Sequence, residues 1–310
     1  MFFYPHSLLS LVEILFVRNT IEKAREYMEK GMYEEVLDIL GVSGKNAFTP
    51  EKTEELEYIL LAAEAMNRLG WYHVTLEILD LAYRVSEKPF DPVTAEKILI
   101  LTAEALLGHG EYQEALSLLE SAPVSVKTRL LMADAKMRSG DHKAALEIIE
   151  QVIPNISSEH EYVYGMHLLI FLSRPEAFEL CERALKQFPE SISVLSFAYL
   201  LFAFLRLDGP REEITRKVLT IEPRTANEAM AQVMIAEEVS YEKALELVEK
   251  HQKFGRPFKL KKAELLFLLG RFQEMDKLIK ELSNGELENL APYYTVFLNE
   301  AFRTLFIKKD

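Results

Sequence analysis

The chain has 310 residues, of which 49% are hydrophobic and 27% are charged, and its formal net charge at pH 7 is −13. The hydrophobic fraction is sufficient for a continuous core and excludes an intrinsically disordered chain. The negative charge argues against nucleic acid as the main partner, because phosphate backbones are bound by basic surfaces. The single cysteine, Cys181, excludes a disulfide framework and a metal site built from cysteines.

The first predicted element is an apolar helix over residues 7–17. This segment lacks the basic start and the small-residue cleavage site of a signal peptide, and it carries Glu13. Its apolar run is too short to cross a bilayer, and the later apolar run Val194–Leu205 is also too short. We therefore expect no membrane span and a cytoplasmic protein.

After this helix, one turn pattern recurs along the chain: a glycine, any residue, and then a ring-bearing residue. It occurs at Gly31-Met32-Tyr33, Gly110-Glu111-Tyr112, Gly140-Asp141-His142 and Gly270-Arg271-Phe272, with a looser copy at Gly70-Trp71-Tyr72. The segments between these turns have apolar residues at helical spacing and lack the alternation of β-strands. A glycine that follows a helix readily adopts the left-handed conformation that ends it. The pattern predicts an all-α fold of antiparallel helix pairs.

Small residues recur at fixed places inside the helix pairs. One pair contains Ala103, Ala115 and Ala122 followed by Pro123, and a later one reads Ala177-x3-Cys181-x2-Ala184-x4-Pro189. Small residues allow two helix axes to approach closely, so we expect Ala103, Ala115, Ala122, Ala177 and Ala184 to be buried. This order of residues resembles the second half of a tetratricopeptide repeat.

The resemblance covers most of the chain and implies a single right-handed α-α superhelical solenoid over residues 1–310. About eight helix-pair units are expected, at residues 17–41, 53–86, 93–122, 125–153, 158–188, 191–222, 225–253 and 257–284. A C-terminal helix over residues 290–307 would cap the last pair. The sixth unit matches least well, because Arg211 and Thr215 stand where packing residues are expected.

Motifs of catalysis or of cofactor binding are missing from the sequence. The histidines are scattered, and none forms the His-Glu-x-x-His pattern of a zinc site. Gly108-His109-Gly110 resembles half of a dinucleotide-binding fingerprint, but it follows a predicted helix and lacks the third glycine. We therefore expect no catalytic, cofactor-binding or metal-binding residues, and a protein that is not an enzyme. The basic segment Lys253–Lys262 is read as a solvated face, or alternatively as a docking patch for an acidic partner.

The resemblance also implies where a partner binds, since the first helix of each pair lines a concave groove in such proteins. Where glycine is missing from the turn, Leu172, Arg206 and Val239 are taken as the turn residues of the fifth, sixth and seventh units. Counting back from the turns then predicts a polar stretch at Glu64, Glu104 and Asp134, followed by an apolar stretch at Tyr162, Met166, Leu169, Leu200, Phe204 and Val233. An exposed apolar stripe of this length normally meets a partner.

The family's carboxylate clamp, which holds the acidic end of a peptide, is not expected here. Its positions are occupied by Ile21, Arg25, Leu61, Lys97 and Leu101, so most of the required polar side chains are missing.

Two functional hypotheses follow. The first is a non-enzymatic scaffold or adaptor that binds a protein or peptide in the groove. The second is a structural subunit whose apolar middle groove is a homo-oligomer interface.

Overall fold

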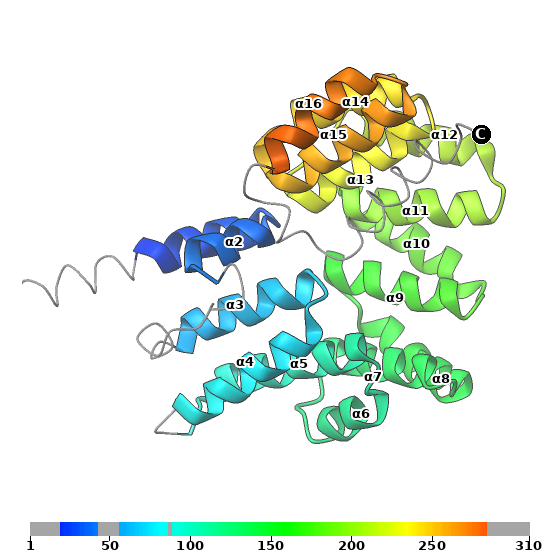
Figure 1. Cartoon of the computed structure of the whole chain (residues 1–310). Coiled ribbons are helices and arrows are strands. Elements are labelled where there is room, and N and C mark those ends of the chain that lie inside the picture. Colours follow the sequence, from blue (N-terminus) through cyan, green and yellow to red (C-terminus); the bar gives the residue numbers. More distant parts are fainter. Residues whose placement is uncertain (1–18, 43–55, 86–88, 284–310) are drawn as a thin grey trace, which may run out of the picture. The chain divides into compact units, whose positions relative to one another are not determined.

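The computed structural model describes residues 19–42, 56–85 and 89–283 (Figure 1). Within these ranges the regular secondary structure is entirely helical, which confirms the predicted all-α class. The predicted helices at residues 7–17 and 290–307 lie outside the described ranges. None of the described helices combines the length and the apolar content that a bilayer crossing requires.

The chain divides into two compact units, Met1–Ile214 and Thr215–Asp310. In the N-terminal unit, helical residues 19–29 are followed by α2 (Tyr33–Leu40), α3 (Leu56–Arg68), α4 (Tyr72–Val85), α5 (Pro92–His109), α6 (Tyr112–Glu120), α7 (Val126–Arg138), α8 (His142–Val152), α9 (Glu159–Phe171), α10 (Glu176–Gln187) and α11 (Ile192–Phe204). Helix α12 (Asp208–Val218) crosses the boundary between the two units. The C-terminal unit contains α13 (Ala226–Glu237), α14 (Tyr241–Lys250), α15 (Arg256–Leu268) and α16 (Phe272–Ser283). A single solenoid along the whole chain stays a prediction.

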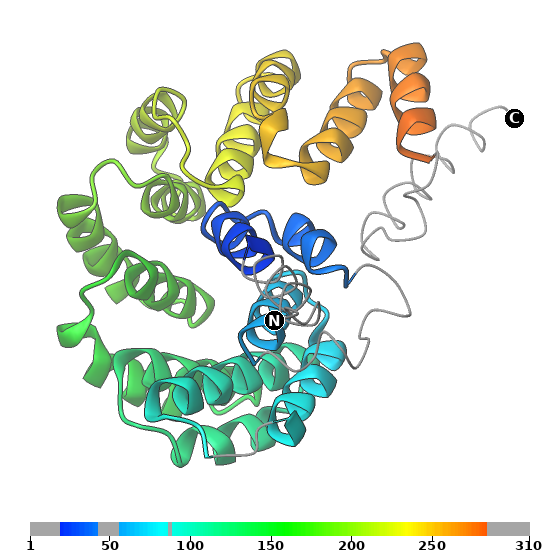
Figure 2. The same cartoon turned by 90° about the vertical axis from the view of Figure 1, so that its left-hand side faces the viewer.

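Within the N-terminal unit, successive helices pack against each other from α2 to α8 and again from α9 to α11. The two helices of each pair are in contact, as in α3 with α4, α5 with α6 and α7 with α8. The first helices also contact one another along the series α3, α5, α7, α9 and α11. Figure 2 shows this succession from cyan to green. The first helices therefore share one face of the unit.

Side-chain caps fix where several of these helices begin. The carboxylate of Asp91 accepts hydrogen bonds from the backbone N–H groups of Val93 and Thr94 at the start of α5. At the start of α9, Ser158 and Glu161 form a capping box, in which each side chain accepts from the other residue's backbone N–H. These caps satisfy donors that have no partner within the helix.

The turn that ends α9 is centred on Ser173 rather than on Leu172. Ser173 has a positive φ of 54°, and its N–H bonds to the carbonyl of Ile170 while the N–H of Arg174 bonds to Leu169. Gly140 and Asp141 form the same pair of bonds at the end of α7. Ser173 therefore occupies the glycine position of this pair, one residue later than predicted.

The turn after α13 differs from the others. The N–H groups of Val239 and Ser240 both bond to the carbonyl of Ala236, and no residue of this turn has a positive φ. Ser240 then caps α14, its side chain accepting from the N–H of Lys243. The connection is as long as the turn at Gly140, which ends α7 at Arg138 and caps α8 with Asp141, so the two turns differ in backbone conformation and not in length.

The small residues at helix crossings are buried as predicted, with one exception. Ala103, Ala115, Ala177 and Ala184 are at most 1% exposed. Ala122 is only half-buried, because α6 ends at Glu120 and Ala122 lies in the turn beyond it. Cys181 is fully buried, and the removal of its thiol from water raises its pKa to about 12. It is therefore a core side chain and not a reactive thiol.

Candidate functional site

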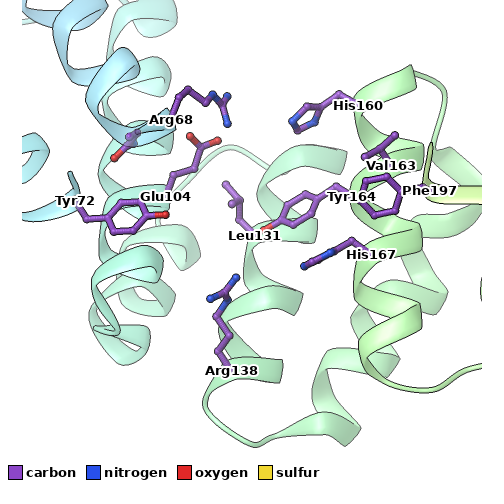
Figure 3. Close-up of a pocket in the computed structure, with 11 residues that line it drawn as sticks. Arg68, Tyr72, Glu104, Leu131, Arg138, His160, Val163, Tyr164, His167 and Phe197 are labelled. Carbon is purple, nitrogen blue, oxygen red and sulfur yellow. The ribbon is translucent and has the colours of Figure 1, made fainter. Parts of the chain in front are cut away.

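A pocket of about 350 Å³ opens on the shared face of the first helices in the N-terminal unit (Figure 3). Side chains from α3, α4, α5, α7, α9 and α11 line it. They are Asn67, Arg68, Tyr72, Glu104, Leu131, Arg138, His160, Val163, Tyr164, His167 and Phe197. Apart from Tyr72, all of them come from the first helices of their pairs.

The pocket has two polar ends and an apolar middle. Figure 3 shows Arg68 and His160 pointing toward each other at one end, and Arg138 and His167 at the other. Leu131 and the ring of Tyr164 lie between these ends, and Phe197 contributes an aromatic side chain from α11. Such a combination of apolar surface with a few placed polar groups is typical of ligand sites.

Asp134 holds the Arg138 end together. Its carboxylate accepts a 2.7 Å hydrogen bond from Nε of Arg138 and a 2.8 Å bond from the hydroxyl of Tyr164. Burial raises the pKa of Tyr164 well above its usual value, and the charge of Asp134 raises it further. For Arg138, desolvation lowers the pKa, but the bond to Asp134 outweighs it and the net shift is upward. The predicted groove residue Asp134 is only 4% exposed, so it positions Arg138 and Tyr164 rather than facing a partner.

The other two predicted acidic residues are paired with lysines of the next first helix. Glu104 on α5 lies 3.2 Å from Nζ of Lys127 on α7, and Glu64 on α3 lies 2.9 Å from Nζ of Lys97 on α5. The acidic stretch predicted from the sequence is therefore largely neutralised by cations that tie neighbouring pairs together.

The two histidines of the pocket are held in their neutral form at pH 7. Desolvation lowers the pKa of His160, and the positive charges of Arg68 and Lys127 lower it further, although its side chain stays accessible to solvent. Desolvation also lowers the pKa of His167; nearby Asp134 opposes the shift and Arg138 adds to it. Each neutral imidazole keeps one N–H donor and one acceptor nitrogen.

Tyr72 reaches the pocket because Gly108 has no side chain. A Cβ atom at position 108 would lie 2.3 Å from Cζ of Tyr72, far inside the van der Waals distance. Asn67 joins α3 to α5, since its Nδ2 donates a 2.8 Å hydrogen bond to the carbonyl of Leu101. Tyr72 was not among the residues that the sequence pattern predicted to line the groove.

Four of the predicted apolar groove residues are instead core residues. Tyr162 is 3% exposed, while Met166, Leu169 and Val233 are fully buried. For the three residues of α9 the reason is register, because the turn that ends α9 is centred on Ser173, one residue later than predicted. A shift of one residue rotates a side chain by about 100° around a helix axis. The equivalent of Glu104 and Asp134 on α9 is therefore His167, whereas Val233 on α13 stands at the position of Asp134 and is buried as Asp134 is.

The remaining two apolar predictions are exposed residues of α11. Leu200 is 56% exposed and Phe204 is 65% exposed, and the nearby Phe171 and Leu205 are exposed as well. We call these four residues the apolar patch. A second pocket of about 290 Å³ adjoins it and is lined by Ile170, Ser173, Arg174, Pro175, Ala177, Phe178, Leu201, Phe204 and Leu205.

The basic segment of the C-terminal unit is engaged in ion pairs. Lys261 contacts Glu237 at 2.7 Å and Glu264 at 3.0 Å, and Lys262 contacts Glu249 at 2.9 Å. These acids come partly from other helices, which the sequence order does not reveal. Across the described residues there is no cluster of three or more histidine, cysteine or acidic side chains that could hold a metal ion.

Comparisons with known proteins agree with this architecture. Residues 106–165 match the sequence model of the tetratricopeptide repeat family. The crystal structure of yeast Tom70 is similar to this chain with a TM-score of 0.50 and 14% identity, over 95% of this chain and 61% of that one. No sequence match to a curated protein is found.

Two further solved structures are similar at a lower level. A human IFIT1 dimer with PPP-AAAA has a TM-score of 0.43 and 13% identity, over 89% of this chain and 61% of that one. NprR in complex with its cognate peptide NprX has a TM-score of 0.36 and 13% identity, over 93% of this chain and 95% of that one. The chain thus spans about three fifths of the length of Tom70 and of IFIT1. The family match and the fold confirm that this is a tetratricopeptide-like helical-repeat protein.

Proposed function

We propose that this tetratricopeptide-like helical-repeat protein is a non-enzymatic scaffold or adaptor that holds a peptide segment of a partner protein. The segment binds at the pocket on the shared face of the first helices in the N-terminal unit. The observation that carries the proposal is the convergence of side chains from six helices on one opening with an apolar middle and two polar ends. Such a surface provides contact area for apolar side chains and hydrogen bonds that fix their orientation.

The side chains of this pocket are already held in position before a peptide binds. Arg138 and Tyr164 are fixed by Asp134, and Tyr72 is seated against Gly108. A site that is ordered in advance loses less conformational entropy on binding. Phe197 and Leu131 supply the apolar contacts that anchor a side chain.

The test is a selection of peptides of about twelve residues from a random display library, followed by affinity measurements on variants. Phe197→Ala should weaken binding of the selected peptides by about tenfold or more, because it removes an aromatic wall of the pocket. The matched control is Phe272→Ala, which removes an exposed phenylalanine in the C-terminal unit and should leave affinity unchanged. Equal binding by wild type and Phe197→Ala, with both folded, would place the site elsewhere.

The apolar patch supports a second function, that of a structural subunit that associates with copies of itself. Phe171, Leu200 and Phe204 are all more than half exposed, and an apolar pocket adjoins them. Exposed apolar side chains beside an apolar pocket are typical of interfaces. Under this alternative, the mass measured by sedimentation rises with concentration, and Leu200→Glu abolishes the rise without unfolding α11, since glutamate favours helices. A monomeric wild type at all concentrations would rule it out.

A further inference from the structure

We infer that the Arg68–His160 end of the pocket is a subsite for an anionic side chain of the bound peptide, either a carboxylate or a phosphate. This inference rests on the proposed function, because it names the chemistry of a side chain of the peptide that is proposed to bind in the pocket. The two residues come from the last position of α3 and the start of α9, and they point toward each other across the opening (Figure 3).

The charge of Arg68 favours an anion at this end of the pocket. Its side chain is exposed, and it forms no ion pair or hydrogen bond with any other residue that the structure describes. Arg138, at the opposite end, is already committed to Asp134 through its Nε. A guanidinium group binds oxyanions well because it presents parallel N–H donors in one plane. Of the two arginines in the pocket, Arg68 is thus the one whose charge is not paired with an acid among the described residues.

The acidic side chains around this end are already engaged with other groups. Glu104 is the acid nearest to this end on α5, and it is paired with Lys127 at 3.2 Å. Glu161 on α9 is engaged at the start of that helix, where its Oε2 accepts from the N–H groups of Ser157 and Ser158 at 3.0 Å. Both carboxylates therefore have cationic or N–H partners, and the charge of Arg68 is left for an incoming anion.

His160 provides a second group that can bind the anion. The imidazole is solvent-accessible and faces Arg68, so one ring N–H is available to share the anion. Desolvation lowers the pKa of His160, and the positive charges of Arg68 and Lys127 lower it further. The negative charges of Glu104 and Glu161 act in the opposite direction. A bound anion adds a negative charge at this point and favours the protonated ring. Anion binding should therefore be accompanied by proton uptake at His160.

This subsite differs in its residues from the carboxylate clamp of the family. Of the clamp positions in this chain, Ile21, Leu61 and Leu101 cannot bind an anion. The two cations at the other positions are paired with acids, Arg25 with Glu57 and Lys97 with Glu64. Next to the subsite lie Leu131, Val163 and Tyr164. The expected ligand is therefore an acidic or phosphorylated residue close to an apolar or aromatic one.

The experiment follows the ring signals of His160 and His167 by NMR while inorganic phosphate or acetate is added at constant ionic strength, with chloride as the reference. We expect phosphate, acetate or both to shift the His160 signals and raise its pKa, with a smaller effect on His167. Arg68→Gln should weaken this anion binding about tenfold or more, because it removes the charge and the paired donors. Arg84→Gln is the matched control, since Arg84 pairs with Asp80 on α4 and lies outside the pocket.

The outcomes separate this inference from the proposed function. If phosphate and acetate leave His160 unchanged while selected peptides still bind in a Phe197-dependent manner, the scaffold stands and the anionic subsite is wrong. If the anions bind through Arg68 but no peptide binds, the proposed function fails and the peptide form of the inference fails with it. Peptides that bind, are enriched in acidic residues and lose affinity in Arg68→Gln would support both. A response to phosphate but not to acetate would identify the phosphorylated residue as the ligand.

Discussion

At the scale of single residues, Gly108 decides where a pocket side chain lies. A Cβ at this position would overlap the ring of Tyr72, with distances of 2.3 to 2.5 Å to three ring carbons. Gly108→Ala should displace this ring from the pocket and destabilise the fold by about 1 kcal/mol or more through overpacking. Thermal unfolding and the NMR signals of the Tyr72 ring measure the two effects.

Gly209→Ala provides the matched control for this substitution. Gly209 also lies in a helix, but nothing stands within 4 Å of a Cβ built there. The alanine should be neutral or stabilise α12 by up to about 1 kcal/mol, since glycine is a poor helix former. If both variants melt alike, the contact between Gly108 and Tyr72 is not rigid.

Ala115 illustrates the close approach of the two helices in a pair. It is fully buried on α6 in a cluster with Ala103, Leu107 and Leu119. Ala115→Leu should overpack this crossing and cost about 1–3 kcal/mol in the free energy of unfolding, as measured by urea denaturation. Ala122→Leu should cost less, because Ala122 is half-buried beyond the end of α6. Equal effects would contradict the packing described here.

At the scale of the helical elements, two turns contain a non-glycine residue in the left-handed conformation. Ser173 has φ of 54° and Arg206 has φ of 57°, in the places that glycine occupies elsewhere. This conformation costs roughly 1–2 kcal/mol for residues with a Cβ. Ser173→Gly should therefore stabilise the protein by about 0.5–1 kcal/mol, part of the gain being offset by the greater freedom of glycine in the unfolded chain.

The control for Ser173→Gly is Ser139→Gly, at the position before Gly140. Ser139 has φ of −77° and ψ of −2°, which a residue with a side chain adopts without strain. Here glycine should destabilise slightly, so the two substitutions should shift the melting temperature in opposite directions. A loss of stability in Ser173→Gly would show that its side chain is needed in the turn.

A buried histidine links the helices of the C-terminal unit. His251, which follows α14, is fully buried, and its Nε2 lies 2.7 Å from Oε1 of Gln232 on α13. The Gln232 amide in turn donates to the carbonyls of Val218 and Ile221 at 2.7 and 2.9 Å. Desolvation lowers the pKa of His251, and the positive charge of Lys250 lowers it further.

This network predicts a loss of stability in mild acid. Because the pKa of His251 is lower in the folded state than its ordinary value of 6.5, the unfolded chain binds the proton more tightly. The stabilisation is present above about pH 6.5 and is lost as the pH falls from there through the folded-state pKa. Unfolding measured between about pH 7.5 and 5.5 should therefore depend less on pH in His251→Gln than in wild type. His142→Gln is the control, because it replaces a histidine at an exposed position. If the free energy of unfolding depends on pH in the same way in wild type and in His251→Gln, His251 is not the group responsible.

At the scale of the whole molecule, charge distribution bears on the choice of partner. The chain carries a net charge of −13, and several lysines of its most basic segment are paired with acids, among them Lys253 with Glu222 at 3.5 Å. Duplex DNA should therefore bind weakly, with a dissociation constant above about 1 μM at physiological salt. Fluorescence anisotropy with a labelled duplex tests this. Submicromolar binding would contradict it, and Lys259 would then be the first residue to replace.

Much of the architecture was determined locally by the sequence. The recurrent glycines predicted the turns at Gly70, Gly110, Gly140 and Gly270, and each has the expected positive φ. The apolar spacing between these turns predicted helices and no strands. Both signals depend on residues a few positions apart, whose backbone preferences act without the rest of the fold. The small residues at crossings were predictable for the same reason.

Only the tertiary structure decided which side chains face a partner. Ser173 adopts a left-handed conformation that its residue type does not predict. Because the turn is one residue later than predicted, Met166 lies in the core and His167 lines the pocket. The pairing of Glu104 with Lys127 likewise joins two helices that are separate in the sequence. The periodicity of apolar residues predicts that a helix has a buried face. Which side chains lie on that face depends on the turn that ends the helix and on the packing of the neighbouring helix pair. The pocket is formed by six helices together, so it follows from their packing and from no single segment.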